Sequence, residues 1–95
     1  MRATQIKQAA NFYKVLAHPV SVRVISLLQK RECKVRDIYN TLNMEQSATS
    51  AQLNKLAKVG AVNSRKEGRN KYYFVVRERL AKAEEAAQLV TFKND

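Results

Sequence analysis

Apolar and polar positions recur at helical spacing in the middle of the chain. From Gln46 to Val59 the sequence reads QSATSAQLNKLAKV. The residues of the buried side recur at intervals of three and four: Thr49, Leu53, Leu56 and Val59. This spacing indicates an amphipathic helix with polar side chains over the rest of its surface. Gly60 follows directly, and glycine readily takes the left-handed conformation that ends a helix.

A shorter helical pattern precedes this segment. Residues 35–42 read VRDIYNTL, with apolar and aromatic side chains on one side. The connection is only Asn43, Met44 and Glu45, which is typical of a helix-turn-helix. Asn43 stands where the chain must turn sharply, and asparagine tolerates positive φ better than most residues do. Taken alone, the pair is also compatible with a small helical protein in which both stripes form only a core.

Further helices are predicted at both ends of the chain. A stripe of alanine and larger apolar residues predicts a first helix from about Thr4 to Ala17. Pro19 ends that helix and suits the first turn of a second one. A last helix is predicted from about Glu78 to Phe92. Its balanced charge and many alanines suit packing against another helix.

A β-hairpin is predicted over residues 62–76, which read VNSRKEGRNKYYFVV. The run Glu67-Gly68-Arg69-Asn70 supplies turn residues, and the β-branched and aromatic residues after it favour a strand. Basic side chains flank this turn: Arg65, Lys66, Arg69 and Lys71. Two interpretations are open. The loop presents positive charge to a polyanion, or its charges only prevent the edge from pairing with another molecule.

The net charge of +10 is distributed unevenly along the chain. Residues 46–76 carry six basic side chains and one acidic one, so they contribute +5, whereas residues 77–95 carry four of each and contribute nothing. A basic surface binds polyanions through phosphate neutralisation and counterion release, so double-stranded DNA is the expected partner. A membrane partner is disfavoured, because no basic amphipathic helix carries bulky apolar anchors.

Length and composition predict one domain over residues 1–95, with a core small enough that a dimer would help to stabilise it. No apolar run approaches membrane-spanning length and no signal-peptide pattern is present, so a cytoplasmic location is expected. The single Cys33 excludes an intramolecular disulfide. The sequence shows no nucleophile beside a base and no phosphate-binding glycine loop, so neither an enzyme nor a cofactor is expected.

Several segments resemble the ArsR/SmtB family of winged-helix repressors, over about residues 10–92. Residues 16–25, LAHPVSVRVI, are similar to the family's LADPTRLRIL, and residues 44–62 are similar to LSQSTVSHHLKVLREAGLV. Glu67-Gly68-Arg69 and Tyr72-Tyr73 match the family's wing. The resemblance implies a mainly α winged helix-turn-helix fold in the order α-α-α-α-β-β-α.

The same resemblance implies a function. The chain would be a homodimeric transcriptional repressor that pairs through its first and last helices. Two recognition helices would then enter successive major grooves of a pseudo-palindromic operator, about one helical turn apart.

One part of the family pattern is missing. Metal-sensing members carry the box ELCVCDL, for which this chain has ECKVRDI at residues 32–38. Lys34 and Arg36 stand where the box has its two thiolates. A second family site on the last helix lacks its ligands too, because His18 is the only histidine. Soft-metal and zinc sites need several Cys or His donors, so we expect no metal and no metal sensing.

Two roles are open for Cys33. The neighbouring cations Arg31, Lys34 and Arg36 would lower its pKa and favour a redox-reactive thiolate. By the resemblance, however, Cys33 replaces a buried apolar residue, which favours a small core side chain. His18 stands where the family has a helix-capping Asp, which predicts a poor cap rather than a pH sensor.

The leading hypothesis is a sequence-specific DNA-binding dimer. The side-chain amide of Gln or Asn can form two hydrogen bonds with the edge of one adenine, and the short hydroxyl of Ser suits a phosphate or a base edge. The candidate base readers are Gln46, Ser47, Ser50, Gln52 and Asn54. The candidate phosphate contacts are Lys55, Arg65, Lys66, Arg69 and Lys71. Two alternatives are a protein-interaction module whose basic face docks an acidic partner, and a redox-responsive regulator acting through Cys33.

Overall fold

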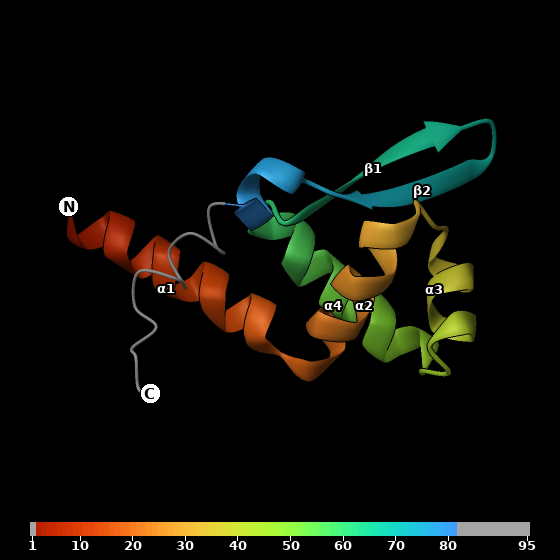
Figure 1. Cartoon of the computed structure of the whole chain (residues 1–95), viewed down its shortest axis with the longest axis horizontal. Helices are drawn as coiled ribbons and strands as arrows, with labels where there is room; N and C mark the ends of the chain where they lie inside the picture. Colours follow the sequence, from red (N-terminus) through yellow and green to blue (C-terminus); the bar gives the residue numbers. More distant parts are fainter. Residues whose placement is uncertain (1, 82–95) are drawn as a thin grey trace.

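The computed structural model describes residues 2–81 of the 95-residue chain. In this range four helices precede a two-stranded antiparallel hairpin (Figure 1): α1 (Ala3–Ala17), α2 (Pro19–Lys30), α3 (Val35–Thr41), α4 (Gln46–Lys58), β1 (Val62–Glu67) and β2 (Asn70–Val75). Residues 77–81 begin a further helix, so the predicted order α-α-α-α-β-β-α is confirmed. The rest of the predicted last helix lies outside the described residues. None of the helices described is long and apolar enough to cross a membrane.

The junction between α1 and α2 forms at His18-Pro19, as predicted. His18 has an extended backbone, with φ −62° and ψ 135°, which a following proline favours. Its Nδ1 accepts a hydrogen bond from the Val20 N–H at 3.1 Å and so caps α2. The expectation of a poor cap was therefore wrong, because a ring nitrogen replaces the carboxylate oxygen as acceptor.

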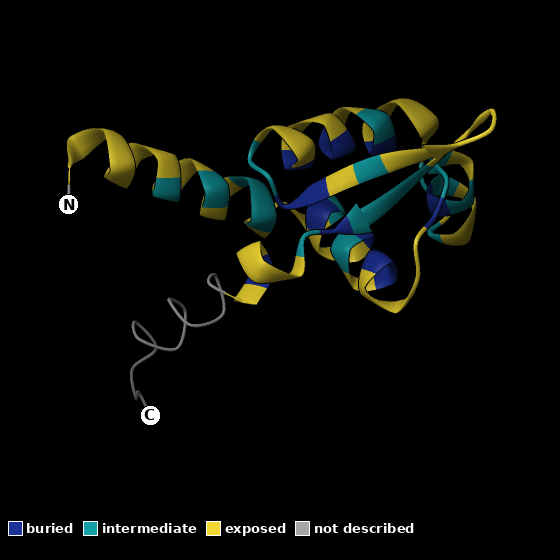
Figure 2. Ribbon diagram, turned by 90° about the horizontal axis from the view of Figure 1, so that it is seen from above, coloured by how far each residue is buried: buried dark blue, intermediate teal, exposed yellow. Residues whose placement is uncertain are grey.

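The core lies between α2, α3, α4 and the hairpin, where Figure 2 shows the buried segments. Its buried apolar residues come from these elements, from the connections between them and from the helical segment at residues 77–81: Val24, Leu27, Leu28, Cys33, Ile38, Leu53, Leu56, Ala61, Val62, Val75 and Leu80. In α4, Thr49, Leu53 and Leu56 are buried as the stripe predicted, and Val59 just after it is half-buried. The Thr49 hydroxyl is satisfied by donating to the Glu45 carbonyl at 2.8 Å.

Two similar turns fix where α4 begins and ends. After α3, Asn43 has a φ of +54°, and the Met44 N–H donates to the Tyr39 carbonyl at 2.9 Å. After α4, Gly60 has a φ of +81°, and the next N–H donates to the Leu56 carbonyl, also at 2.9 Å. Both turns are Schellman motifs. The left-handed conformations predicted for Asn43 and Gly60 are confirmed.

The hairpin closes at a two-residue turn. Glu67 pairs with Asn70, and only Gly68 and Arg69 lie between them. Gly68 has a φ of +64°, a conformation that favours glycine in two-residue hairpin turns. This turn matches the right-handed twist of the strands, so the hairpin projects away from the core as a ribbon (Figure 1).

An additional backbone pairing ties the hairpin to the connection between α2 and α3. The Tyr73 N–H donates to the Cys33 carbonyl at 2.7 Å, and the Cys33 N–H donates back to the Tyr73 carbonyl at 3.1 Å. No local pattern predicted this bridge. It gives β2 a second neighbour and fixes the direction in which the hairpin leaves the body.

Helix α1 extends away from the body of the molecule (Figures 1 and 2). None of its residues is fully buried, and Ile6 and Tyr13 are 53% and 41% exposed. Phe12 and Val15 pack partly against the core. Helix α1 therefore presents large apolar side chains that residues 2–81 do not cover.

Candidate nucleic-acid interface

The exposed face of α4 carries polar side chains at helical spacing. Ser47 and Asn54 are both exposed and are separated by seven residues, so they lie on the same side of the helix, opposite the core. Gln46 is exposed at the first turn, and Ser50 is half-buried at the border. Four of the predicted base readers therefore lie on or next to one accessible strip of α4: Gln46, Ser47, Ser50 and Asn54.

Gln52 lies on the other side of α4. The residue is only 5% exposed, and its Nε2 donates a hydrogen bond to Ser21 Oγ of α2 at 2.8 Å. Ser21 is itself fully buried. The bond joins α4 to α2, and Gln52 is not on the strip formed by Ser47 and Asn54. The pattern of apolar residues did not predict that Gln52 is buried, because glutamine is polar and is mostly exposed in folded proteins.

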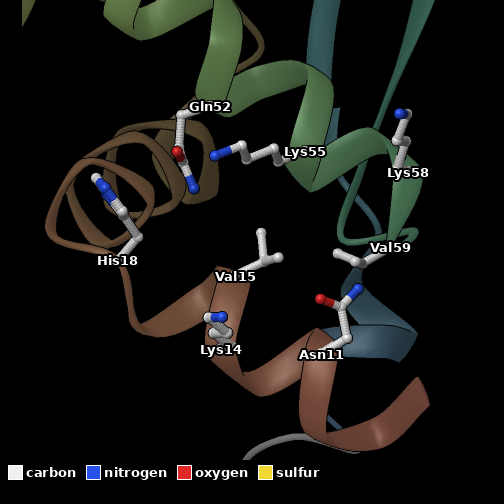
Figure 3. A pocket seen from close by; sticks show the side chains of 8 residues that line it. All are labelled: Asn11, Lys14, Val15, His18, Gln52, Lys55, Lys58 and Val59. Carbon is white, nitrogen blue, oxygen red and sulfur yellow. The ribbon is translucent and has the colours of Figure 1, made fainter. Parts of the chain in front are cut away.

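Sequence reasoning missed Lys58, which extends the accessible strip. Lys58 is exposed and follows Asn54 by four residues, so both lie on one side of α4. Lys55 is also exposed, but Figure 3 shows its amino group extending toward Gln52 and His18, across a cleft beside α1. The helical spacing of Ser47, Asn54 and Lys58 is the signal that could have identified the missed lysine.

Two lysines of the hairpin are directly opposed. Lys66 and Lys71 pair across the strands, and both are exposed. Like charges in directly opposite positions destabilise a sheet, so this arrangement costs stability unless an anion lies between or beside them. Lys71 Nζ also lies 5.3 Å from the centre of the Tyr73 ring. Arg69 is exposed in the turn, so three cations project from the outer half of the hairpin.

Arg65 differs from these three because it is paired within the chain. Its Nε donates to Glu32 Oε1 at 2.8 Å, and its Nη1 lies 3.4 Å from Glu67 Oε1. The hydrogen bond to Glu32 raises the pKa of Arg65 above its ordinary value. The guanidinium also lies 5.0 Å from the centre of the Tyr72 ring. Arg65 therefore braces the hairpin against the α2–α3 connection, and its charge is partly offset.

Cys33 is buried, with 1% of its surface exposed, and its Sγ donates to the Arg31 carbonyl at 3.6 Å. Burial raises the pKa of the thiol above its ordinary value of 9.0, outweighing the opposite effect of Arg31. A raised pKa and a covered sulfur both oppose thiolate chemistry. These observations favour the core role over the redox role.

The residues that replace the family's thiolates differ in their surroundings. Lys34 is the N-cap residue of α3 and is half-buried, whereas Arg36 is exposed on that helix. Among residues 2–81, no three His, Cys, Asp or Glu side chains gather closely enough to hold a metal ion.

The order of the elements, the helix-turn-helix of α3 and α4, and the basic hairpin after them define a winged helix-turn-helix domain. Comparison with known proteins agrees with this class. The family model described as bacterial regulatory protein, arsR family, matches residues 18–64. A biofilm growth-associated repressor from Agrobacterium fabrum is 31% identical over 85 residues, which are 90% of this chain and 70% of that protein. The chain therefore belongs to the ArsR family of transcriptional regulators.

Two further relatives agree with that family. A transcriptional repressor SmtB homolog from Synechocystis is 37% identical over 73 residues, which are 77% of this chain but only 55% of the Synechocystis protein. A homodimeric winged helix-turn-helix DNA-binding domain from Mycobacterium bovis superposes with a TM-score of 0.79 at 31% identity. That match covers 93% of this chain and 82% of the Mycobacterium domain.

Proposed function

We propose that this chain is a sequence-specific DNA-binding repressor that acts as a homodimer on a pseudo-palindromic operator. The observation that carries the proposal is the accessible polar strip of α4, and the hairpin that follows α4 adds three projecting cations. Helix α4 would enter the major groove and the hairpin would follow the backbone or the minor groove. The base readers would be Gln46, Ser47, Ser50 and Asn54.

Phosphate contacts would come chiefly from the hairpin. Lys66, Arg69 and Lys71 project from its outer half, and a phosphate beside the opposed lysines would relieve their repulsion. Lys58 would add a contact at the far end of the strip. Arg65 and Lys55 would contribute less directly, because Arg65 is paired with Glu32 and Lys55 extends into the cleft beside α1.

Pairing of two subunits through α1 accounts for its uncovered apolar side chains. Ile6 and Tyr13 would be removed from water in a dimer. Because both are already about half covered, each would contribute less than the roughly 1.5–3 kcal/mol of burying a fully exposed apolar side chain. The relative from Mycobacterium bovis is described as homodimeric. The last helix, predicted to share this interface, lies largely outside the described residues.

The alternative of a protein-interaction module makes a different prediction. Docking of an acidic partner would use the same cations but would not need the polar strip of α4, so it implies little preference among DNA sequences. The exposed amides and hydroxyls at Gln46, Ser47 and Asn54 favour base readout over docking. We also propose that DNA release does not depend on zinc, since Lys34 and Arg36 replace the family's thiolates.

The wing is tested by measuring DNA affinity over a series of salt concentrations. The double variant Arg69→Ala, Lys71→Ala should reduce the slope of log affinity against log salt by about 1 for each phosphate that is no longer neutralised. The matched control is Lys30→Ala, Arg77→Ala, which removes the same charges from a cleft between α2 and β2. An unchanged slope in the first pair, or an equal reduction in both pairs, would remove the wing from the DNA interface.

A further inference from the structure

A cleft of about 320 Å³ lies between the C-terminal halves of α1 and α4 (Figure 3). Helix α1 contributes Lys14 and Val15, α4 contributes Gln52 and Lys55, and Val59 lies at the end of α4. The volume is at the lower end of the range for small-molecule pockets. The cleft is thus large enough for a compact organic molecule.

The cleft is positively charged. Lys14 and Lys55 belong to its opposite walls, and none of the residues 2–81 that line it is acidic. Within residues 2–81, neither lysine forms a salt bridge. Figure 3 shows the amino group of Lys55 extending across the cleft toward Gln52 and His18. Lys58 also lines the cleft, but its amino group points away from it. Two cations in the lining of one cleft, with no acidic side chain beside them among residues 2–81, favour an anionic occupant.

The remaining lining combines an apolar wall with a buried hydrogen-bond donor. Val15 and Val59 are both half-buried, and Figure 3 shows them facing each other from the two helices. Gln52 is buried, with only 5% of the residue exposed, and one of its amide hydrogens bonds Ser21. Nε2 carries a second amide hydrogen, for which residues 2–81 supply no acceptor. Charge, donor and apolar wall together suit a carboxylate that carries a short apolar body.

We propose that this cleft binds a small organic carboxylate, with the carboxylate held by Lys14, Lys55 and Gln52 and the apolar body against Val15 and Val59. The binding would be coupled to DNA affinity, and this second part rests on the proposed function. The physical reason is that one wall belongs to the helix proposed to pair the subunits and the other to the helix proposed to read DNA. If α1 and α4 can take two spacings, a ligand that binds one of them more tightly must increase the population of that spacing.

Binding is tested without DNA, using benzoate as the probe in an NMR titration of the ¹⁵N-labelled full chain. Saturable shifts at millimolar benzoate should centre on Val15, Gln52 and Val59. The neutral analogue benzamide should bind at least tenfold more weakly, because it lacks the charge. Inorganic phosphate should also bind more weakly, because it lacks the apolar body.

Two double variants separate the cleft from the general positive charge. Lys14→Gln, Lys55→Gln should abolish the saturable shifts, whereas the matched pair Lys7→Gln, Lys30→Gln should keep them, since neither of those residues lines the cleft. No saturable shift with benzoate would overturn the proposal, and so would equal binding of benzoate and benzamide. Equally weakened binding in both double variants would also overturn it.

Coupling is tested by measuring affinity for a selected DNA site as benzoate is increased. Coupling predicts that the affinity changes by about fivefold or more and then reaches a plateau once the cleft is full. Direct competition with a DNA phosphate for Lys55 predicts instead a continued fall without a plateau, which would refute the coupling. Because benzoate binding is measured without DNA, the cleft can fail this test while the DNA-binding proposal stands, and the reverse also holds.

Discussion

Gln52 of α4 donates a hydrogen bond to Ser21 of α2 at 2.8 Å, and both side chains are buried. The bond satisfies two polar groups that would otherwise be costly to remove from water. It fixes the rotation of α4 against α2, and thereby the direction in which Ser47 and Asn54 face. We infer that Gln52, which sequence reasoning placed among the base readers, instead positions the helix.

Replacing Gln52 tests this role. Gln52→Leu should lower the free energy of unfolding by about 1–3 kcal/mol, because Ser21 Oγ would be left buried without a partner. The double variant Gln52→Leu, Ser21→Ala should recover part of that stability, because both polar partners are then gone. Denaturant unfolding of the variants and the parent chain measures the effect. If Gln52→Leu instead keeps full stability and changes the preferred DNA sequence, Gln52 reads bases after all.

The two glycines with positive φ provide a matched pair. Gly60→Ala and Gly68→Ala should each lower the free energy of unfolding by roughly 1–2 kcal/mol, because an L-residue is strained at positive φ. Gly60 should cost more, since an added Cβ would lie 3.1 Å from Nη2 of Arg79, whereas at Gly68 nothing lies within 4 Å. Thermal unfolding of both variants gives the comparison.

The additional cost at Gly60 has a definite source. Arg79 Nη2 donates to the Val59 carbonyl at 2.8 Å, and its guanidinium lies 5.4 Å from the centre of the Phe12 ring. Displacing Arg79 therefore disturbs contacts with both α1 and the end of α4. Equal costs at the two glycines would show that Arg79 moves aside freely.

Cys33 should react slowly with alkylating reagents in the folded protein. Its sulfur is covered and burial raises its pKa, so little thiolate is available. The thiol has no effect on the pH dependence of stability well below its ordinary pKa of 9.0, because it is protonated whether folded or unfolded. Above that value the unfolded chain loses the proton first, so stability should fall as the pH rises.

The measurement compares iodoacetamide labelling in buffer and in denaturant, together with unfolding free energies at increasing pH. Cys33→Ala should remove this part of the alkaline destabilisation. Fast labelling of the folded protein, combined with release of DNA by oxidant that Cys33→Ser abolishes, would support the redox-responsive alternative.

The opposed lysines predict a conflict between stability and DNA binding. Lys66→Glu should raise the free energy of unfolding by about 0.2–1 kcal/mol, because repulsion from Lys71 becomes attraction. The same change should weaken DNA binding, because a negative charge would then face the phosphates. Arg69→Glu is the control, since Arg69 lies in the turn and has no partner across the strands. It should weaken DNA binding without stabilising the hairpin.

The elements followed from the sequence because each boundary has a local cause. Pro19 fixes the start of α2, and the left-handed conformations of Asn43 and Gly60 fix the ends of the helix-turn-helix. The hairpin followed from Gly68 and the β-prone residues around it. Local signals of this kind depend on a few neighbouring residues and need no knowledge of the tertiary structure.

The candidate site was less predictable, because its members differ in long-range contacts. Gln52 meets Ser21, which is 31 residues earlier, and Arg65 meets Glu32, which is 33 residues earlier. Neither contact leaves a periodic trace in the sequence. The extra pairing of Cys33 with Tyr73 is also long-range. Lys58, by contrast, could have been found, because helical spacing alone places it beside Asn54.

Selection of binding sites from a random pool of duplex DNA is the most direct test of sequence-specific binding by a dimer. We expect enrichment of an inverted repeat whose half-sites lie about one helical turn, roughly 10–10.5 base pairs, apart. Ser47→Ala or Asn54→Ala should relax the preference at particular positions in each half-site, whereas Arg69→Ala should weaken binding to all sequences alike. Recovery of no preferred sequence would contradict the proposed function and favour docking of an acidic partner.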